Sequence, residues 1–214
     1  IPINKLCYAH YTDHLPTVTV AEDYVPTSVH PDTCHSVSVH FESALDATLT
    51  ASLLNASAGN QGGTEAYYQY SIDTFIYAAF GLARAYLNLP INFDRNKADG
   101  SGATKPQLRP DFVCWVNKKL VFKGEEKKSG DVHVVANELV DKMMKGTGLL
   151  PYLLCYASAG TTIQFAAIDS KHKLHFIGDT LDISKPQGRF YVMRAMVNVI
   201  RILRTAVARS PARQ

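Results

Sequence analysis

Two short runs of β-branched and aromatic residues constrain the fold most strongly. They are Phe112-Val-Cys-Trp-Val116 and Leu120-Val-Phe122, with Asn117-Lys-Lys119 between them, and the second run continues through Lys127. Runs of this kind around a short polar turn predict a β-hairpin. Because hairpin strands are antiparallel, a sheet that also contains strands joined by a helix must be mixed.

Helical and strand-like patterns alternate on both sides of this hairpin. Helical spacing of apolar residues covers about 65–89, 132–143 and 184–208, and strand-like runs cover about 150–157, 161–168 and 172–178. Thr64 is the expected N-cap of the first helix, and Gly146 is the expected stop of the second. This order predicts an α/β fold in which helices flank a mixed sheet.

The first 63 residues do not continue this pattern. They hold short alternating stretches at 16–20 and 36–40 and a helical pattern at 41–53. A glycine-rich loop follows at 58–63. We therefore expect an N-terminal extension over residues 1–63 and a core domain over residues 64–214. Within the core, the polar segment 92–110 contains glycine and proline and is expected to be a mobile loop.

Composition narrows the class of protein. A chain of 214 residues that is 46% apolar and 19% charged is a folded protein, because disordered chains are poor in apolar residues and rich in charge. The net charge of +3 permits contact with a polyanion without requiring it. The four cysteines form no C-x-x-C pair, and we expect most of them to be reduced and buried.

Two features bear on location. No charged residue lies between Lys145 and Asp169, but polar and turn-forming residues interrupt this stretch. Two buried strands are therefore favoured over a membrane span, and no membrane partner is expected. The sequence begins at Ile1 without an initiator methionine or a signal-peptide pattern, so we expect a piece of a longer protein whose targeting segment is absent.

Charged residues lie at the open end of the predicted hairpin, where its first strand begins and its second strand ends. Asp111 precedes the first strand, and Glu125 and Lys127 lie near the end of the second, so the turn brings the three together. Residues i and i+2 of a strand share a face. Glu125 and Lys127 should therefore point to one side of the sheet, and Glu126 and Lys128 to the other.

Two carboxylates and one ammonium group suit a divalent metal with oxygen ligands. Asp111 and Glu125 would hold Mg²⁺ (or Mn²⁺), and Lys127 would orient or activate an attacking water or neutralise charge on a phosphoryl group. Without a metal, two carboxylates this close would repel each other. The alternative is a solvated hairpin end whose residues form weak surface ion pairs.

These residues also carry a family resemblance. Pro110-Asp111 followed by Glu125-Glu126-Lys127 resembles the bipartite signature of the PD-(D/E)XK restriction-endonuclease-like superfamily, whose order of helix, hairpin, helix and strand is similar to the order predicted here. A longer string within about 105–205 resembles the nuclease-like domain of Crinkler effectors from oomycetes and fungi. It comprises Arg109-Pro-Asp-Phe112, Leu120-Val-Phe-Lys-Gly-Glu-Glu-Lys127, Glu138-Leu-Val-Asp-Lys142, Pro151-Tyr152, Cys155-Tyr-Ala157 and Gly160.

The resemblance implies a secreted effector that acts inside a host cell, often in its nucleus, and disturbs nucleic acid. Crinklers usually carry an N-terminal translocation region, and relatives fuse a kinase-like or P-loop module, whereas this chain contains no Walker A sequence. We expect Mg²⁺-dependent hydrolysis of phosphodiester bonds in DNA or RNA. The alternative is a catalytically inactive module of the same fold that binds nucleic acid, a host protein or a fused kinase-like domain.

Other charged residues could support this site. The resemblance implies a further acid on the first core helix, and Glu65 is preferred over Asp73 because Asp73 falls close to the apolar face. Glu65 could instead interact only with the helix dipole. Glu138 and Lys142 are four residues apart on a helix, which predicts a surface ion pair.

Basic residues could follow a nucleic-acid backbone. Arg194, Arg201 and Arg204 recur along one side of the last helix, and Arg109 and Lys128 flank the acidic residues. Such a stripe beside a phosphodiesterase site would contact phosphates. The alternative for the last helix is a solvated face opposite its apolar side.

The N-terminal region offers a weaker zinc hypothesis. Cys7, His10 and His14, with Cys34-His35 further on, have ligand types and spacings found near zinc sites, so a zinc-organised interaction domain is a third alternative. Asn55-Ala-Ser57 is a glycosylation sequon, which we interpret as an ordinary loop asparagine.

Overall fold

The computed structural model of the protein describes residues 63–209, except residue 106 and residues 144–149. Three helices and six strands follow one another along this part of the chain. In order they are α4 (Glu65–Leu87), β1 (Ile91–Arg95), β2 (Phe112–Val116), β3 (Lys119–Lys127), α5 (Val132–Asp141), β4 (Tyr152–Ala159), β5 (Thr162–Asp169), β6 (Leu174–Asp182) and α6 (Pro186–Arg209).

The six strands form one mixed sheet in the order β1-β2-β3-β4-β5-β6. Strands β3 and β4 are parallel, and α5 provides the crossover between them. The other neighbouring pairs are antiparallel. The predicted α/β fold with a mixed sheet flanked by helices is therefore confirmed.

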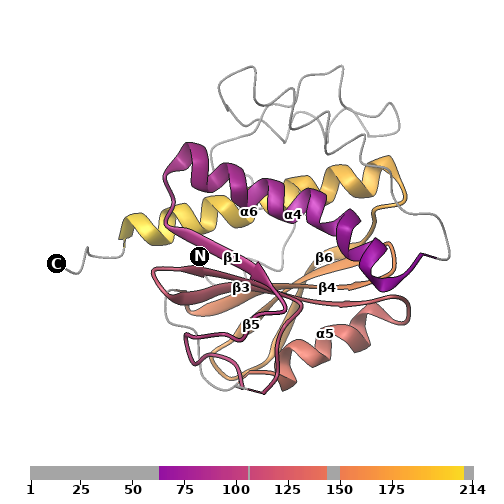
Figure 1. Ribbon diagram of the computed structural model, residues 1–214, viewed down its shortest axis with the longest axis horizontal. Coiled ribbons are helices and arrows are strands. Elements are labelled where there is room, and N and C mark those ends of the chain that lie inside the picture. Colours follow the sequence, from indigo (N-terminus) through magenta and orange to yellow (C-terminus); the bar gives the residue numbers. More distant parts are fainter. Residues whose placement is uncertain (1–62, 106, 144–149, 210–214) are drawn as a thin grey trace.

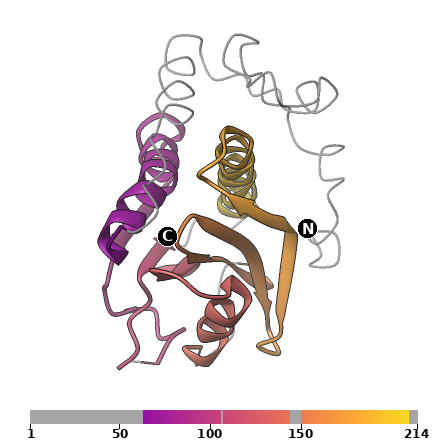
Figure 2. The same cartoon turned by 90° about the vertical axis from the view of Figure 1, so that its right-hand side faces the viewer.

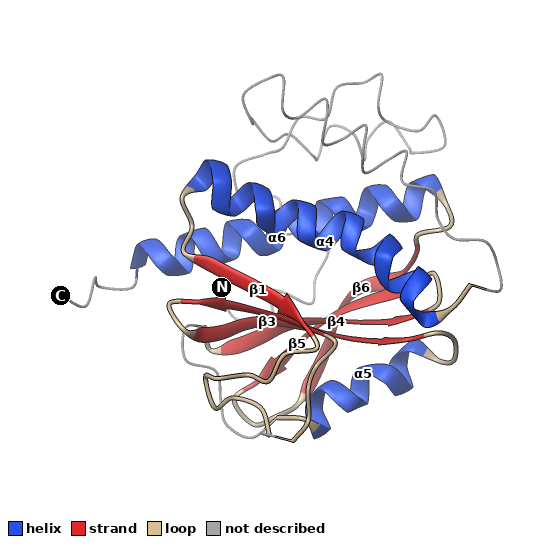
Figure 3. Cartoon of the chain, viewed as in Figure 1, coloured by secondary structure: helices blue, strands red, loops and turns tan. Residues whose placement is uncertain are grey.

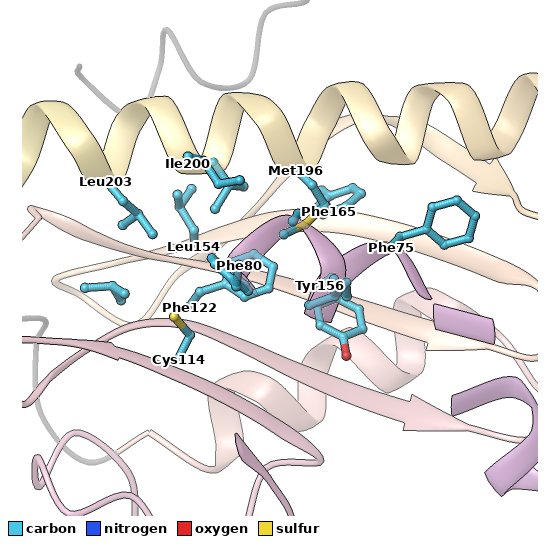
Figure 4. Close-up of a cluster of buried hydrophobic side chains, with 14 of the residues drawn as sticks. Phe75, Phe80, Cys114, Phe122, Leu154, Tyr156, Phe165, Met196, Ile200 and Leu203 are labelled. Atoms are coloured by element: carbon cyan, nitrogen blue, oxygen red, sulfur yellow. The ribbon is translucent and has the colours of Figure 1, made fainter. Parts of the chain in front are cut away.

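The helices cover both faces of the sheet. Helices α4 and α6 lie side by side on one face, and α5 lies on the other (Figures 1 and 2). The larger apolar cluster lies between the sheet and the α4–α6 pair, and it includes Phe80, Phe122, Tyr156 and Met196 (Figure 4). A smaller cluster lies under α5 and includes Leu139. Each layer thus buries its own apolar face, as a sheet with two covered faces requires.

The predicted hairpin is confirmed and has a two-residue turn. Strand β2 ends at Val116 and β3 begins at Lys119, and the two turn residues, Asn117 and Lys118, have φ angles of 50° and 63°. Left-handed backbone at both positions gives the turn a twist that matches paired strands.

Helix α5 begins where the sequence predicts and ends earlier. The Asp131 carboxylate accepts a hydrogen bond from the His133 amide, 2.9 Å away, and so caps the N-terminus. The helix ends at Asp141, and Lys142 is its C-cap. Met143 already forms a bridge with Thr104. That tertiary pairing ends the helix before the expected stop at Gly146, which lies outside the described residues.

The loop predicted over 92–110 begins later in the structure than its polarity indicated. Its first residues belong to β1, which pairs with β2 along its whole length. Beyond β1, the Asp99 carboxylate accepts hydrogen bonds from the amides of Ser101 and Thr104 and from the Trp115 indole, 2.7 Å away. The prediction was wrong for residues 92–95, because an edge strand needs few apolar residues, and the mobility of the loop that follows stays a prediction.

Several other expectations have an outcome in this part of the chain. Cys114 and Cys155 are free and buried, as expected. None of the helices in residues 63–209 that the structure describes is long and apolar enough to cross a membrane. The N-terminal extension, its helical pattern at 41–53, the cysteines and histidines of the zinc hypothesis and the Asn55 sequon lie outside the described residues.

Candidate active site

The predicted site lies at the open end of the hairpin, where β2 begins and the last residues of β3 extend beyond it along β4 (β3 and β4 are labelled in Figure 3). The last pair between these strands joins Phe112 to Gly124, and β3 then extends along β4 to Lys127. Asp111 stands just beyond that last pair. Its carboxylate Oδ2 accepts a hydrogen bond from the Glu126 amide, 2.7 Å away, so this side chain bonds to β3 just beyond the first residue of β2.

The predicted alternation of β3 side chains is confirmed. Lys127 Nζ lies 3.3 Å from Glu125 Oε1, so these two residues share a face, which is the face covered by α5. Glu126 points to the other face, toward α4 and the Tyr156 ring. Asp111, Glu125 and Lys127 are therefore brought together as the hairpin predicted, with Asp111 fixed through the backbone between the two others.

Residues of α5 complete the surroundings of Glu125. The Glu125 side chain is only 1% exposed, and its Oε2 accepts a hydrogen bond from Lys142 Nζ. Lys127 Nζ also lies 3.0 Å from Glu138 Oε2. The predicted surface pair of Glu138 with Lys142 is thus replaced by two ion pairs to β3. The helix ends at Asp141, so Lys142 reaches back to the buried Glu125, and Glu138 pairs with Lys127 of the neighbouring strand instead.

Burial dominates the electrostatics of Glu125. The pKa of this carboxyl is raised to about 7, mainly by burial and also by the Asp111 charge, although the hydrogen bond from Lys142 acts in the opposite direction. The charged form of Glu125 therefore depends on nearby cations.

Lys127 remains a cation in this setting. Burial lowers its pKa, but the carboxylates of Glu138 and Glu125 raise the pKa by more, so the net shift is upward. A lysine with a raised pKa neutralises negative charge and orients an oxygen by hydrogen bonding. It is a poor general base, which leaves the electrostatic role as the one that the geometry supports.

A second charged cluster lies behind the site, on the α4 face. Arg95 Nη1 lies 2.8 Å from Glu126 Oε2, and the same guanidinium contacts the Asp73 carboxylate at 2.5–2.7 Å. The Tyr156 hydroxyl donates to Glu126 Oε1 at 2.5 Å. Four elements, α4, β1, β3 and β4, thus meet at the buried Glu126 side chain.

In this cluster, burial and the ion pairs shift the pKa in opposite directions, both for Glu126 and for Arg95. Burial raises the pKa of Glu126, although Arg95 opposes the shift. Burial also lowers the pKa of Arg95, but the hydrogen bonds that Arg95 donates to Glu126 and Asp73 raise it by more. The sequence analysis missed this cluster because Arg95 was placed in a loop, and its partners lie 22 and 31 residues away along the chain.

The remaining predicted acidic and basic residues near the site are exposed. Glu65 lies in the first turn of α4, and its role as a further acid stays a prediction. Lys128 follows the last residue of β3, and the Arg109 side chain lies in the loop that leads to Asp111. The Arg109 carbonyl oxygen accepts a hydrogen bond from Lys142 Nζ at 3.3 Å.

The basic residues of the last helix lie on a different layer. Arg194, Arg201 and Arg204 belong to α6, which packs against α4 and β6 on the face opposite α5. Arg204 is exposed, whereas Arg201 is half-buried, and burial lowers its pKa to about 10. Their proposed contact with nucleic acid stays a prediction.

Asp111 and Glu125 are oxygen donors of the type that magnesium and manganese take in proteins. Within residues 63–209, apart from the undescribed positions, no group of three or more histidine, cysteine, aspartate or glutamate side chains is arranged to hold a metal ion. Mg²⁺, however, commonly uses one or two protein carboxylates and completes its shell with waters and substrate phosphates. Asp111 and Glu125 would supply such a pair, and the cations that already contact the buried Glu125 carboxylate are Lys127 and Lys142.

Comparisons with known proteins give one similarity. The chain is 30% identical over 156 residues to Crinkler effector protein 8 from Phytophthora infestans. The aligned part covers 70% of this chain and 24% of that protein, so the chain spans about a quarter of the length of its relative. No protein-family model and no solved structure matches the chain. The similarity agrees with the Crinkler resemblance of the sequence motifs.

Proposed function

We propose that the described core is a metal-dependent nuclease domain that hydrolyses phosphodiester bonds in DNA or RNA. The observation that carries the proposal is the junction of Asp111, Glu125 and Lys127 at one end of the β2–β3 hairpin, with Glu125 almost fully buried. Surface ion pairs at a solvated strand end would leave that carboxylate exposed, so the burial of Glu125 favours a site over the alternative reading.

The order of elements supports the same proposal. Helix α4, the antiparallel strands β1 to β3, helix α5 and the parallel strand β4 follow one another along the chain. This is the helix, hairpin, helix and strand order that the PD-(D/E)XK resemblance implies. The similarity to a Crinkler effector supports a role as part of a secreted effector that acts in a host cell, with the nucleus as the proposed place of action.

Each residue would have a distinct role. Asp111 and Glu125 would hold Mg²⁺ or Mn²⁺, which when bound stabilises charge on phosphoryl oxygens and lowers the pKa of a bound water. Lys127 would neutralise charge on the substrate phosphate, since its two carboxylate partners keep it cationic. The Glu126 amide fixes the Asp111 carboxylate.

A cleavage assay tests the proposal. The purified chain is incubated with labelled double-stranded DNA, single-stranded DNA and RNA, each with Mg²⁺, Mn²⁺ or EDTA. We expect metal-dependent cleavage that falls about 100-fold or more in Glu125→Gln and in Lys127→Met. Lys171→Met, an exposed lysine in the β5–β6 turn, is the matched control. Full cleavage by Glu125→Gln would exclude the assigned site.

A specific observation favours a second function, a non-catalytic module of the same fold. Both Glu125 oxygens are already engaged by lysines of the chain, Lys127 at Oε1 and Lys142 at Oε2. Such a module would bind nucleic acid, a host protein or a fused domain. It would show salt-sensitive nucleic-acid binding that survives Glu125→Gln and Lys127→Met, with no cleavage under any metal condition.

A further inference from the structure

The two lysines that contact Glu125 are held differently. Lys127 is 39% exposed and has a second carboxylate partner in Glu138, 3.0 Å from its Nζ. Lys142 is 14% exposed, contacts Glu125 Oε2 and has the Arg109 carbonyl oxygen as a second acceptor at 3.3 Å. Of the two lysines at this carboxylate, Lys142 is therefore the more buried. Its ammonium group also contacts the backbone of the loop that leads to Asp111.

A divalent ion held by Glu125 and the Lys142 ammonium group would both interact with the negative charge of the same carboxylate. A bound ion at Asp111 and Glu125 would bring two positive charges next to an ammonium that already contacts Glu125 Oε2. Like charges a few ångströms apart in a partly buried site repel strongly, because the surrounding protein screens them less than water does. One of the two cations must therefore weaken its hold on Glu125.

We propose that Lys142 competes with the divalent ion for Glu125 and thereby sets the affinity of the site for metal. This inference rests on the proposed function, because it uses the same two carboxylates. When the ion binds, the Lys142 ammonium leaves Glu125 and keeps its hydrogen bond to the Arg109 carbonyl oxygen, so it does not lose every partner. Lys127 keeps Glu138 in the same way and can stay in place.

The position of Lys142 explains how a short movement suffices. It is the C-cap residue of α5, and its backbone amide still donates to the Glu138 carbonyl oxygen while its side chain reaches back to β3. Only the end of the side chain has to move away from the Glu125 carboxylate, while its hydrogen bond to the Arg109 carbonyl oxygen is kept. The lysine would then act as a counter-ion that stabilises the buried Glu125 charge until metal replaces it.

Direct metal binding by the full chain tests this inference. Mn²⁺ binding is measured by titration calorimetry and by the free-ion electron paramagnetic resonance signal, without substrate. We expect Lys142→Met to bind Mn²⁺ about tenfold more tightly than the wild type, because the competing charge is gone. Lys142→Arg, which keeps the charge, should bind no more tightly than the wild type. Lys173→Met, an exposed lysine in the β5–β6 turn, controls for a general change in net charge.

A labelling experiment on the wild type keeps the test independent of how well the variants fold. Amine acetylation followed by mass spectrometry should modify Lys142 faster with Mn²⁺ than with EDTA, while Lys173 is unchanged. Equal or weaker Mn²⁺ binding by Lys142→Met, or labelling of Lys142 that Mn²⁺ does not increase, would overturn the role of Lys142. Wild-type affinity in Glu125→Gln would instead show that the metal site itself is wrongly placed, which overturns the proposed function as well.

Discussion

Buried charge on strand β3 sets the pH dependence of the molecule at the residue scale. Lys123 is fully buried, and its Nζ donates to the Leu139 carbonyl oxygen in the last turn of α5. This carbonyl would otherwise be one of the unsatisfied groups at a helix C-terminus. Burial lowers the pKa of Lys123 to about 8. The lysine therefore binds its proton less tightly in the folded chain than in the unfolded one.

Stability should rise with pH through the titration of Lys123. Between the folded pKa of about 8 and the ordinary value of 10.5, the unfolded state holds more protons, so raising the pH favours folding. Relative to Lys123→Met, the wild type should gain about 3 kcal/mol of unfolding free energy from pH 7.5 to pH 10.5. Urea unfolding of both proteins across this range measures the difference, in which other titrating groups cancel. Parallel pH profiles would show that Lys123 titrates normally.

Gly124 is required by the close approach of Tyr156. A Cβ at position 124 would lie 2.2 Å from the Tyr156 ring, and that ring is fully buried in the larger apolar cluster. Gly124→Ala should therefore destabilise the fold by about 1–3 kcal/mol, because the ring cannot move without disturbing its hydrogen bond to Glu126. Thermal unfolding measures the loss. In a Tyr156→Leu background the same substitution should cost less, and an equal cost would point to backbone strain instead.

At the scale of elements, the Arg95 cluster ties the first helix to the strands that carry the site. It joins Asp73 on α4 to Glu126 on β3 through Arg95 on β1. Arg95 is 15% exposed and Glu126 is 2% exposed, so water does little to screen their interaction. Loss of one partner would leave a buried charge without compensation.

Arg95→Met should therefore be strongly destabilising. We expect a loss of about 3–5 kcal/mol, with the larger values at higher pH, where Glu126 would have to stay ionised without its partner. Arg95→Met combined with Glu126→Gln should recover part of the loss, since the second substitution removes the uncompensated charge. Denaturant unfolding of the single and double variants forms the measurement. A double variant no more stable than the single one would indicate that Arg95 acts through packing.

The elements also show which features sequence patterns can predict. The hairpin, the helices and the shared face of Glu125 and Lys127 follow from local periodicity, which the chain obeys in each of these segments. Strand β1 and the ion pairs of Lys142 were not predictable in this way. Both depend on partners that only the assembled sheet supplies, such as β2 for β1 and the Glu125 carboxylate for Lys142.

At the scale of the whole molecule, the sheet separates two helical layers that cover different kinds of residues. The α4–α6 layer (Figure 2) holds the larger apolar cluster and faces Glu126, whereas α5, on the other side of the sheet, faces Lys123, Glu125 and Lys127. Arg109 and Lys128 are exposed beside Asp111 and β3, whereas Arg204 is exposed on α6, across the sheet. A phosphodiester held at Asp111 and Glu125 would meet the first two residues before it met α6.

Charge reversal should separate these two surfaces. Arg109→Glu and Lys128→Glu should each weaken nucleic-acid binding about tenfold near physiological salt and reduce the salt dependence, because each removes a phosphate contact. Arg204→Glu, with the same change in net charge, should have a smaller effect. Fluorescence anisotropy at several salt concentrations, with EDTA to prevent cleavage, gives both quantities. If Arg204→Glu produced the larger loss, the α6 face would be the main backbone contact, and the substrate would have to wrap around the end of the sheet to reach Glu125.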